Sequence, residues 1–248
     1  MDQHTRYASL PPIRSLHELR EALRDAGGLR ERIGRPFITL TFAQSLDGSI
    51  ATRDKKPIGL SGPESSRLTH ELRALHEGIL VGIGTVLSDD PRLTVRLVPG
   101  DQPRPFILDT HRRTPPKAQL LRRRDTTPSV VCSESFAAQG QCPLEASGAS
   151  VLPCSTGGDG LIDLNAFLER IGRLGVSSLM VEGGARVISS FLTAGLADLL
   201  VITVAPRLIN GTAVLGPYRG PEIRLQDTCF EPFGRDVVLW AKPCWDGP

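Results

Sequence analysis

Short runs of apolar residues recur along the chain and alternate with stretches whose apolar residues repeat at helical spacing. A run of roughly four to eight apolar residues between turn residues is typical of a strand that is covered on both faces. The first run begins at Phe37, in PFITLTFAQSLDGSIA, and the others are GILVGIG (78–84), RPFILDT (104–110), PSVVCS (128–133), SSLMVE (177–182), LLVITVA (199–205) and DVVLWA (236–241). Strands that alternate with helices favour an α/β domain with a mostly parallel central sheet flanked by helices.

The segment SLHELREALRDAGG predicts a short amphipathic helix near the N-terminus. Ser15 and Glu18 have the spacing of a capping box, leucines follow at helical spacing, and Gly27-Gly28 is expected to stop the helix. Because this helix precedes the first strand, we divide the chain into an N-terminal extension (1–34) and a main domain (35–248).

The segment SGPESSRLTHELRALHEG predicts a second, longer helix. Ser61 and Glu64 again have the spacing of a capping box. The apolar stripe of this helix consists of Leu68, Leu72 and Leu75. Arg73 lies beside the stripe rather than within it, and His70 and His76 are expected to be packing or helix-face residues without proton chemistry.

Three polar stretches between these elements are predicted to lie at the surface. PGDQPRP (99–105) and CSTGGDG (154–160) are rich in turn-forming residues and are expected to be loops. LLRRRD (120–125) is expected to form a charged edge that is exposed to solvent.

Composition excludes several classes of protein. With 248 residues, of which 40% are hydrophobic and 23% charged, the chain can bury a full core. The formal charge of +2 gives no nucleic-acid or membrane footprint, so small molecules are the expected partners. No run approaches the roughly 18 apolar residues of a membrane span, and we assign no signal or anchor.

The cysteines point to a reducing compartment. They are Cys132, Cys142, Cys154, Cys229 and Cys244. Their odd number and the lack of a C-x-x-C pair argue against a zinc site and against a disulfide framework. We therefore expect a cytoplasmic protein.

Two motif-like stretches do not support their usual functions. HELRALH is similar to the metalloprotease motif H-E-x-x-H, but position 74 holds alanine where the second histidine would stand. VGIGTVL places Gly82 and Gly84 after a strand, but Leu87 stands where a dinucleotide fingerprint has its third glycine. The zinc-deaminase pattern of H-x-E with P-C-x-x-C does not occur either.

Three expected strands end in small or polar residues, in VGIGT (81–85), LDTHRR (108–113) and VEGGAR (181–186). Because the carboxyl ends of parallel strands line the ligand crevice, these segments are expected to meet there. Glycines before a helix start expose backbone N–H groups to an anion such as a phosphate. Each segment alone is equally well a turn, but the three together favour a nucleotide cofactor.

Four motifs occur in order and resemble one family: TFAQSLDGSIA, LTHELRALHEGILVGIGTVLSDDPRLTVR, RPFILDT and LMVEGGARVISSFLTAGLADLLVITVAPRLING. They are similar to the pyrimidine reductases of riboflavin biosynthesis, both the stand-alone enzymes and the reductase domain of the bacterial bifunctional deaminase/reductase. The resemblance covers roughly residues 35–242 and implies a dihydrofolate-reductase-like fold. It also implies that a homodimer reduces a ribosylaminopyrimidine 5′-phosphate to the ribitylamino compound with NADPH and without a metal.

Carried over position by position, the resemblance implies a cofactor site and a substrate site. The residues expected at NADPH are Ala43, Thr85, Asp89, Thr110, Gly183, Gly184, Ala185, Arg186, Val187, Ile188, Ser189 and Ser190. Those expected at the substrate are Arg73, Leu93, Arg96 and Glu182. Glu182 and Asp47 are the candidate catalytic residues.

The chemistry of these residue types agrees with the implied roles. The guanidinium groups of Arg73 and Arg96 suit a phosphate, although an arginine on a helix face is more often a solvated charge. Glu182 can accept hydrogen bonds from a pyrimidine, whereas an isolated V-E-G-G would more often place a carboxylate near a helix dipole. Asp47 either shapes the SLDG turn or contacts the substrate. The proton donor stays open between Glu182, Asp47 and water.

The expected substrate is the non-deaminated 2,5-diamino compound, because the chain contains no deaminase domain and Thr41 stands where bacterial bifunctional members have a lysine. The deaminated 5-amino-6-ribosylamino-uracil phosphate stays an alternative. So do a dihydrofolate or other pyrimidine reductase on the same fold, and a sensor that binds the cofactor without oxidising it. Arg112 and Arg113 offer positive charge to a 2′-phosphate, which predicts a preference for NADPH over NADH.

Overall fold

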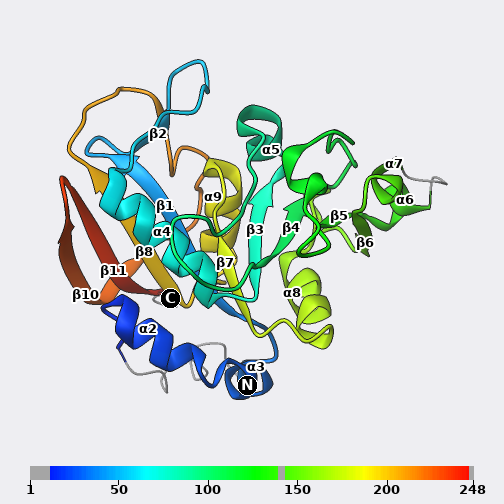
Figure 1. Ribbon diagram of the computed structural model, residues 1–248, viewed down its shortest axis with the longest axis horizontal. Helices are drawn as coiled ribbons and strands as arrows, with labels where there is room; N and C mark the ends of the chain where they lie inside the picture. Colours follow the sequence, from blue (N-terminus) through cyan, green and yellow to red (C-terminus); the bar gives the residue numbers. More distant parts are fainter. Residues whose placement is uncertain (1–11, 139–142, 246–248) are drawn as a thin grey trace.

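Nine strands of the described chain form one sheet, in the order β10-β11-β8-β1-β7-β3-β4-β5-β6 (Figure 1). The structure is a computed structural model that describes residues 12–138 and 143–245. The strands are β1 (Phe37–Ser45), β3 (Gly78–Gly82), β4 (Arg104–Leu108), β5 (Ser129–Ser133), β6 (Ser150–Cys154), β7 (Ser178–Val181), β8 (Leu199–Ala205), β10 (Arg224–Phe233) and β11 (Asp236–Cys244). The strands from β8 to β6 are parallel, whereas β11 is antiparallel to both β8 and β10. The prediction of a mostly parallel sheet is confirmed.

Helices cover both faces of this sheet. They are α2 (Leu16–Leu23), α3 (Ala26–Ile33), α4 (Pro63–Leu75), α5 (Ile83–Asp89), the 3-10 helix η1 (Gln119–Arg122), α6 (Glu134–Ala137), α7 (Pro143–Ala146), α8 (Leu164–Arg173) and α9 (Ala185–Thr193). Two short strands, β2 (Ser49–Ala51) and β9 (Thr212–Ala213), form a separate small sheet. In the part of the chain that the structure describes, no helix has the length and apolarity that a membrane span requires.

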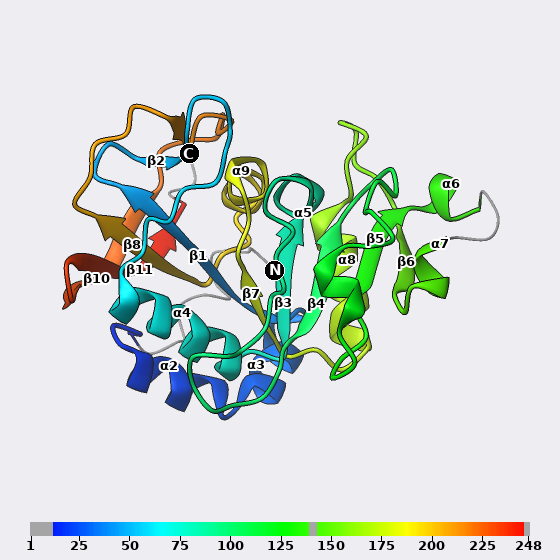
Figure 2. The same cartoon turned by 45° about the horizontal axis from the view of Figure 1, so that its top comes forward.

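The two faces follow from the alternation of side chains along β1. Phe37 belongs to a buried cluster with residues of α2, α3 and α4, and the next residue, Ile38, belongs to a cluster with α8 and α9. Helices α2 and α4 lie side by side (Figure 2). Leu19 of α2 is fully buried in the first cluster, so part of the predicted extension packs against the core of the main domain. The boundary at residue 34 stays a prediction, and residues 1–11 lie outside the described part.

Both predicted helix boundaries that relied on local signals need correction. Gly27 and Gly28 do not stop the first helix but lie within α3, which ends at Gly34 in a left-handed conformation (φ 75°). Ser15 does cap α2, as predicted, by accepting from the N–H of Glu18. The predicted capping box of Ser61 and Glu64 is wrong. The N-cap of α4 is Gly62, and its cap comes from Asp236 of β11, which accepts from the Gly62 N–H at 2.6 Å and from the Ser65 hydroxyl.

Two of the predicted surface stretches are partly buried. Cys154, placed in a loop by the sequence, is the last residue of β6 and is buried. In the predicted charged edge, the side chain of Arg123 is only 4% exposed and donates to the carbonyl of Leu93 at 2.7 Å. Cys132, Cys154, Cys229 and Cys244 are free thiols, and Cys142 lies outside the described residues.

The topology brings four strand ends to one edge of the sheet. Strand β7 is inserted between β1 and β3, and β4 follows β3, all parallel to one another. The strand order therefore changes direction beside β7. In open α/β sheets, such a switch point at the carboxyl ends is where ligands bind.

Candidate active site

Helix α9 begins close to the ends of β7 and β3, and two glycines permit this approach. A Cβ atom on Gly183 would lie 2.6 Å from Cβ of Val187, and one on Gly82 would lie 2.6 Å from Cγ2 of the same valine. No side chain fits at either distance. The structure thus gives Gly183 a packing role, in addition to the cofactor contact that the resemblance implies.

The start of α9 has no side-chain cap. Its N-cap, Gly184, supplies none, and the first N–H groups of the helix carry its positive dipole end. A Cβ on Gly184 would lie 3.3 Å from the hydroxyl oxygen of Thr85 in α5. Helix α5 also begins without a side-chain cap, at Gly82. Two uncapped helix starts and the Thr85 hydroxyl therefore lie together at neighbouring strand ends.

The other residues expected at the cofactor divide into exposed and buried groups. Arg186 and Asp89 are exposed, whereas Ala43, Thr110, Ala185, Val187 and Ser190 are half-buried. Ile188 and Ser189 are buried under α9, so their side chains pack in the interior. The first turn of α9 is thus the part of this run that a ligand can reach directly.

Arg73 and Glu182, expected as separate substrate contacts, bind one another. Nε and Nη2 of Arg73 lie 2.7 Å from Oε1 and Oε2 of Glu182, and Nη1 donates to the carbonyl of Thr94 at 3.0 Å. The two side chains are 11% and 16% exposed. Opposite charge in contact raises the pKa of Arg73 against the effect of burial, which lowers it. The pair is therefore ionised and joins α4 to the turn before α9.

The segment after Pro91 carries the other two residues expected at the substrate. Arg96 is exposed, and among the described residues none pairs with its guanidinium group. Burial and the nearby Arg73 and Arg92 lower the pKa of Arg96. Leu93 has a positive φ of 52°, and its side chain is 2% exposed. Only the backbone of Leu93 can therefore contact a ligand without rearrangement.

Two buried histidines of α4 are neutral and make structural hydrogen bonds. His70 accepts from the backbone N–H of Arg96 at Nδ1, over 3.0 Å. His76 lies 2.7 Å from the carbonyl of Leu72 through Nδ1 and 2.8 Å from the hydroxyl of Thr39 through Nε2. Burial is the main cause that lowers the pKa of both to about 4. These contacts agree with the expected packing role.

Asp47 anchors a turn to a loop that is distant in sequence. Its carboxylate accepts from the N–H groups of Ile209 and Asn210, at 3.1 Å and 2.6 Å, and from the hydroxyls of Ser45 and Ser49. The bond from Ser45 is the largest cause that lowers the pKa of Asp47 well below its usual range. A carboxylate that is held ionised in this way suits the structural alternative better than proton donation.

The end of β4 forms a tight turn around Asp109. Oδ2 of this buried residue accepts from the N–H and hydroxyl of Thr114, at 2.7 Å and 2.8 Å. Its Oδ1 has no hydrogen-bond partner among the described residues and lies 3.9 Å from Nε of Arg113. Arg112 has a positive φ of 51°. The turn thus displays two arginines beside Thr110, at the strand next to β3.

Sequence reasoning missed the residues that hold the site together. Gln102 bonds both backbone polar groups of Val95, and Arg123 binds the carbonyl of Leu93. A glutamine in a Pro- and Gly-rich loop and an arginine in a charged run give no local signal of these contacts. Only the tertiary structure brings them to the segment that carries Arg96.

The residues present fit a nicotinamide dinucleotide. The uncapped starts of α9 and α5 offer unpaired backbone N–H groups to a pyrophosphate. The glycines at 183 and 184 leave the backbone of the turn without side chains. A carboxylate and guanidinium groups for a second ligand lie directly beside this turn.

Comparisons with known proteins agree with this fold and site. The family model described as RibD C-terminal domain matches residues 36–239. The 2,5-diamino-6-ribosylamino-4(3H)-pyrimidinone 5′-phosphate reductase of Methanothermobacter thermautotrophicus is 40% identical over 181 residues, which are 71% of this chain and 81% of that protein. The riboflavin biosynthesis protein RibD of Aquifex aeolicus is 33% identical over 84% of this chain, but the match spans only 58% of that longer protein.

A solved riboflavin biosynthesis reductase of Saccharomyces cerevisiae superposes with a TM-score of 0.69 at 32% identity, over 85% of this chain and 91% of that one. The fold and the site define an oxidoreductase that uses a nicotinamide cofactor and a small-molecule substrate. The chain belongs to the RibD C-terminal domain family, the reductases of riboflavin biosynthesis. The expected recognition and fold class, with the dihydrofolate-reductase-like sheet of these reductases, are confirmed.

Proposed function

We propose that the chain reduces 2,5-diamino-6-ribosylamino-4(3H)-pyrimidinone 5′-phosphate to the ribitylamino compound with NADPH. The observation that carries the proposal is the meeting of an uncapped helix start with Glu182, Arg73 and Arg96 at the carboxyl edge of the sheet. The stand-alone relatives from archaea and yeasts bear the name of this reaction, and the chain spans 81% and 86% of two of them.

On this proposal, the cofactor is held by the first turn of α9 and by Thr85. When bound, the reduced nicotinamide supplies the hydride that the substrate accepts at C1′ of its opened ribose. The chain's own contribution is to hold two ligands next to one another in reactive geometry. The 2′-phosphate that distinguishes NADPH from NADH is assigned to the turn with Arg112 and Arg113, which is half a sheet away from Glu182 in strand order.

The substrate phosphate is assigned to Arg96. Its guanidinium group is exposed and unpaired among the described residues, whereas every nitrogen of Arg73 already donates to Glu182 or Thr94. Arg73 therefore acts chiefly by fixing the carboxylate and completing the positive field. This changes the role, though not the location, that the resemblance implied for Arg73.

Glu182 is assigned to the pyrimidine ring. Each of its oxygens accepts one hydrogen bond from Arg73 and has a further lone pair for an exocyclic amine or a ring N–H. The deaminated ring presents a carbonyl oxygen at one of these positions, and two facing acceptors would leave the carboxylate poorly paired. This argument favours the diamino substrate. Because Asp47 is held ionised, the proton donor is assigned to Glu182 or water.

A homodimer in the cytoplasm is part of the same proposal and is supported by the family resemblance. The surface and the residues that would form such a dimer are not assigned.

A substrate panel tests the function. The protein is mixed with NADPH and, separately, the diamino compound, its deaminated counterpart and dihydrofolate, and loss of the reduced-nicotinamide absorbance is followed. We expect the fastest single turnover with the diamino compound. Faster turnover of the deaminated compound would overturn the substrate assignment and leave the family intact. Binding of NADPH without oxidation by any of the three would favour a sensor.

A further inference from the structure

The segment 93–96 is an irregular stretch whose backbone polar groups are bound by side chains. The carbonyl of Leu93 accepts from Arg123 at 2.7 Å and the carbonyl of Thr94 accepts from Arg73 at 3.0 Å. The N–H of Arg96 donates to His70 at 3.0 Å. Buried or half-buried backbone groups need partners, and here the partners come from α4, η1 and a loop instead of a neighbouring strand.

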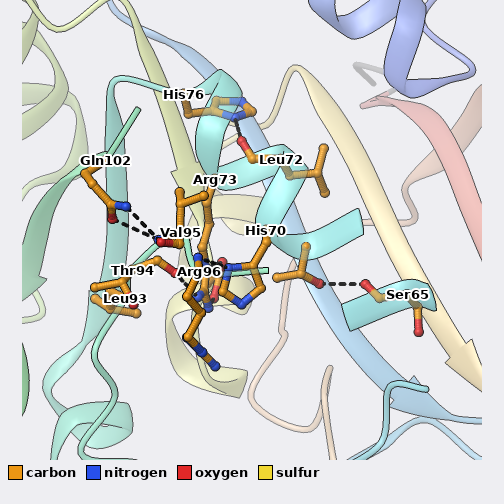
Figure 3. Close-up of polar contacts among 12 residues, drawn as sticks. Ser65, His70, Leu72, Arg73, His76, Leu93, Thr94, Val95, Arg96 and Gln102 are labelled. Atoms are coloured by element: carbon orange, nitrogen blue, oxygen red, sulfur yellow. Dashed lines mark hydrogen bonds and ion pairs between the residues drawn. The ribbon is translucent and has the colours of Figure 1, made fainter. Parts of the chain in front are cut away.

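Val95 is bound by a single amide group. Its N–H donates to Oε1 of Gln102 at 2.9 Å, and its carbonyl accepts from Nε2 of Gln102 at 2.8 Å (Figure 3). The glutamine amide therefore acts as one residue of a missing partner strand. Nη2 of Arg123 lies 3.5 Å from the same Oε1 and helps to fix which way the amide faces.

The two sides of the segment are held in alternation. Residues 94 and 96 bind side chains of α4, and residue 95 between them binds Gln102 on the opposite side (Figure 3). Successive residues of an extended chain point their polar groups to opposite sides, so all these bonds can form together only in an extended conformation. Gln102 is the partner that opposes α4.

His70 can accept from Arg96 only while Nδ1 is unprotonated. The charged groups that face it are Arg73, Arg96 and Glu182. Its burial and the two arginines favour the neutral ring. The α4 side of the segment is therefore intact at neutral pH, which leaves the Gln102 side as the variable that substitution can test.

We propose that Gln102 is a positioning residue, which holds segment 93–96 against α4 so that Arg96 faces the substrate phosphate. The inference rests on the proposed function and goes beyond it by assigning a residue that makes no contact with either ligand. It predicts that loss of the amide weakens substrate binding through Arg96 and leaves cofactor binding unchanged.

The test compares Gln102→Leu with a matched control, Gln226→Leu, on the exposed side of β10. Loss of the two neutral hydrogen bonds should raise KM for the diamino pyrimidine phosphate about tenfold, with kcat and the NADPH Kd within about twofold. Gln226→Leu should match the parent protein. A fall in kcat with unchanged KM would overturn the proposal, because it would indicate a smaller folded fraction.

Two further measurements separate positioning from general destabilisation. In an Arg96→Ala background, Gln102→Leu should raise KM by less than about twofold, because the residue through which it acts is gone. A full tenfold effect there would overturn the proposal. Hydrogen exchange of the Val95 and Arg96 amides, measured without ligands, should accelerate in Gln102→Leu. This readout needs no turnover, so it tests the inference even if the proposed substrate is wrong, and unchanged exchange would overturn it.

Discussion

Arg73 holds both carboxylate oxygens of Glu182, with Nε and Nη2 each 2.7 Å from an oxygen. The pair connects α4 to the turn between β7 and α9, and it lies within the fold where both side chains are largely shielded from water. A bidentate pair of this kind fixes the position of both partners. Recognition of the ring and of the phosphate therefore depends on one unit rather than on two independent residues.

We expect substitutions in this pair to be non-additive. Glu182→Gln removes the charge and should lower kcat/KM by about ten- to a hundredfold. In a cycle of Arg73→Ala and Glu182→Ala, the interaction free energy in kcat/KM should be roughly 1–3 kcal/mol, because either single variant leaves a charge unpaired. The control is the exposed pair Arg173 and Glu169 of α8, 4.0 Å apart, which should couple by less than about 0.5 kcal/mol. Additive effects at Arg73 and Glu182 would contradict the single unit.

Asp47→Asn should affect stability more than chemistry. The amide replaces one acceptor oxygen with a donor that faces the N–H of Ile209 or Asn210, so the anchor of the turn is weakened. We expect kcat at saturating substrate within about threefold of the parent and a lower Tm. Asp54→Asn, in an exposed ion pair with Lys56, is the control and should leave both unchanged. A hundredfold loss of kcat at constant Tm would instead identify Asp47 as the proton donor.

The sequence predicted best those elements whose burial is uniform. Strands β3, β5 and β7 are buried along their whole length and appear as continuous apolar runs. Strand β10 alternates exposed with half-buried residues and lies at the sheet edge, and it was missed. The start of α4 was placed wrongly because its cap, Asp236, comes from 174 residues further along the chain.

The same distinction applies to the candidate site. The three strand-end segments were predicted to meet from the topology of a parallel sheet alone, and the structure brings their strands together. The pairing of Arg73 with Glu182 joins residues 109 positions apart, and nothing local in either segment indicates it. Side-chain partners across such distances depend on the packed structure, which a single sequence does not specify residue by residue.

The turn after β4 predicts the choice of nicotinamide cofactor. Arg112 and Arg113 lie beside Thr110, and the pairing of Arg113 with Asp109 is long, at 3.9 Å, which leaves the guanidinium group open to a phosphate. We expect kcat/KM to be higher with NADPH than with NADH, and the ratio to fall about tenfold or more in Arg112→Ala or Arg113→Ala. Arg20→Ala, on the exposed face of α2, is the control. Equal efficiency with both cofactors in the parent protein would refute the preference, and an unchanged ratio in both variants would place the contact elsewhere.

Stability should fall as the pH decreases from about 6.5 towards 4.5, because His76 is buried in the neutral form. Its pKa in the folded protein is lowered to about 4 from 6.5, chiefly by burial. Between these values the unfolded chain takes up a proton that the folded chain does not, so the contribution is complete above the unfolded pKa and is lost as the pH falls towards the folded one. At about 1.4 kcal/mol per pKa unit, His76 alone can account for a decrease on the order of 3 kcal/mol.

Urea unfolding at pH 7 and pH 4.5 measures this effect above the range in which most carboxylates titrate. His76→Gln should be less stable at pH 7, because the bonds to Leu72 and Thr39 are altered, but its free energy of unfolding should change less between the two pH values. His17→Gln, at an exposed position of α2, should keep the pH dependence of the parent protein. If His76→Gln kept that dependence too, another group would have to be its source, and His70, which shares the lowered pKa, would be the next to replace.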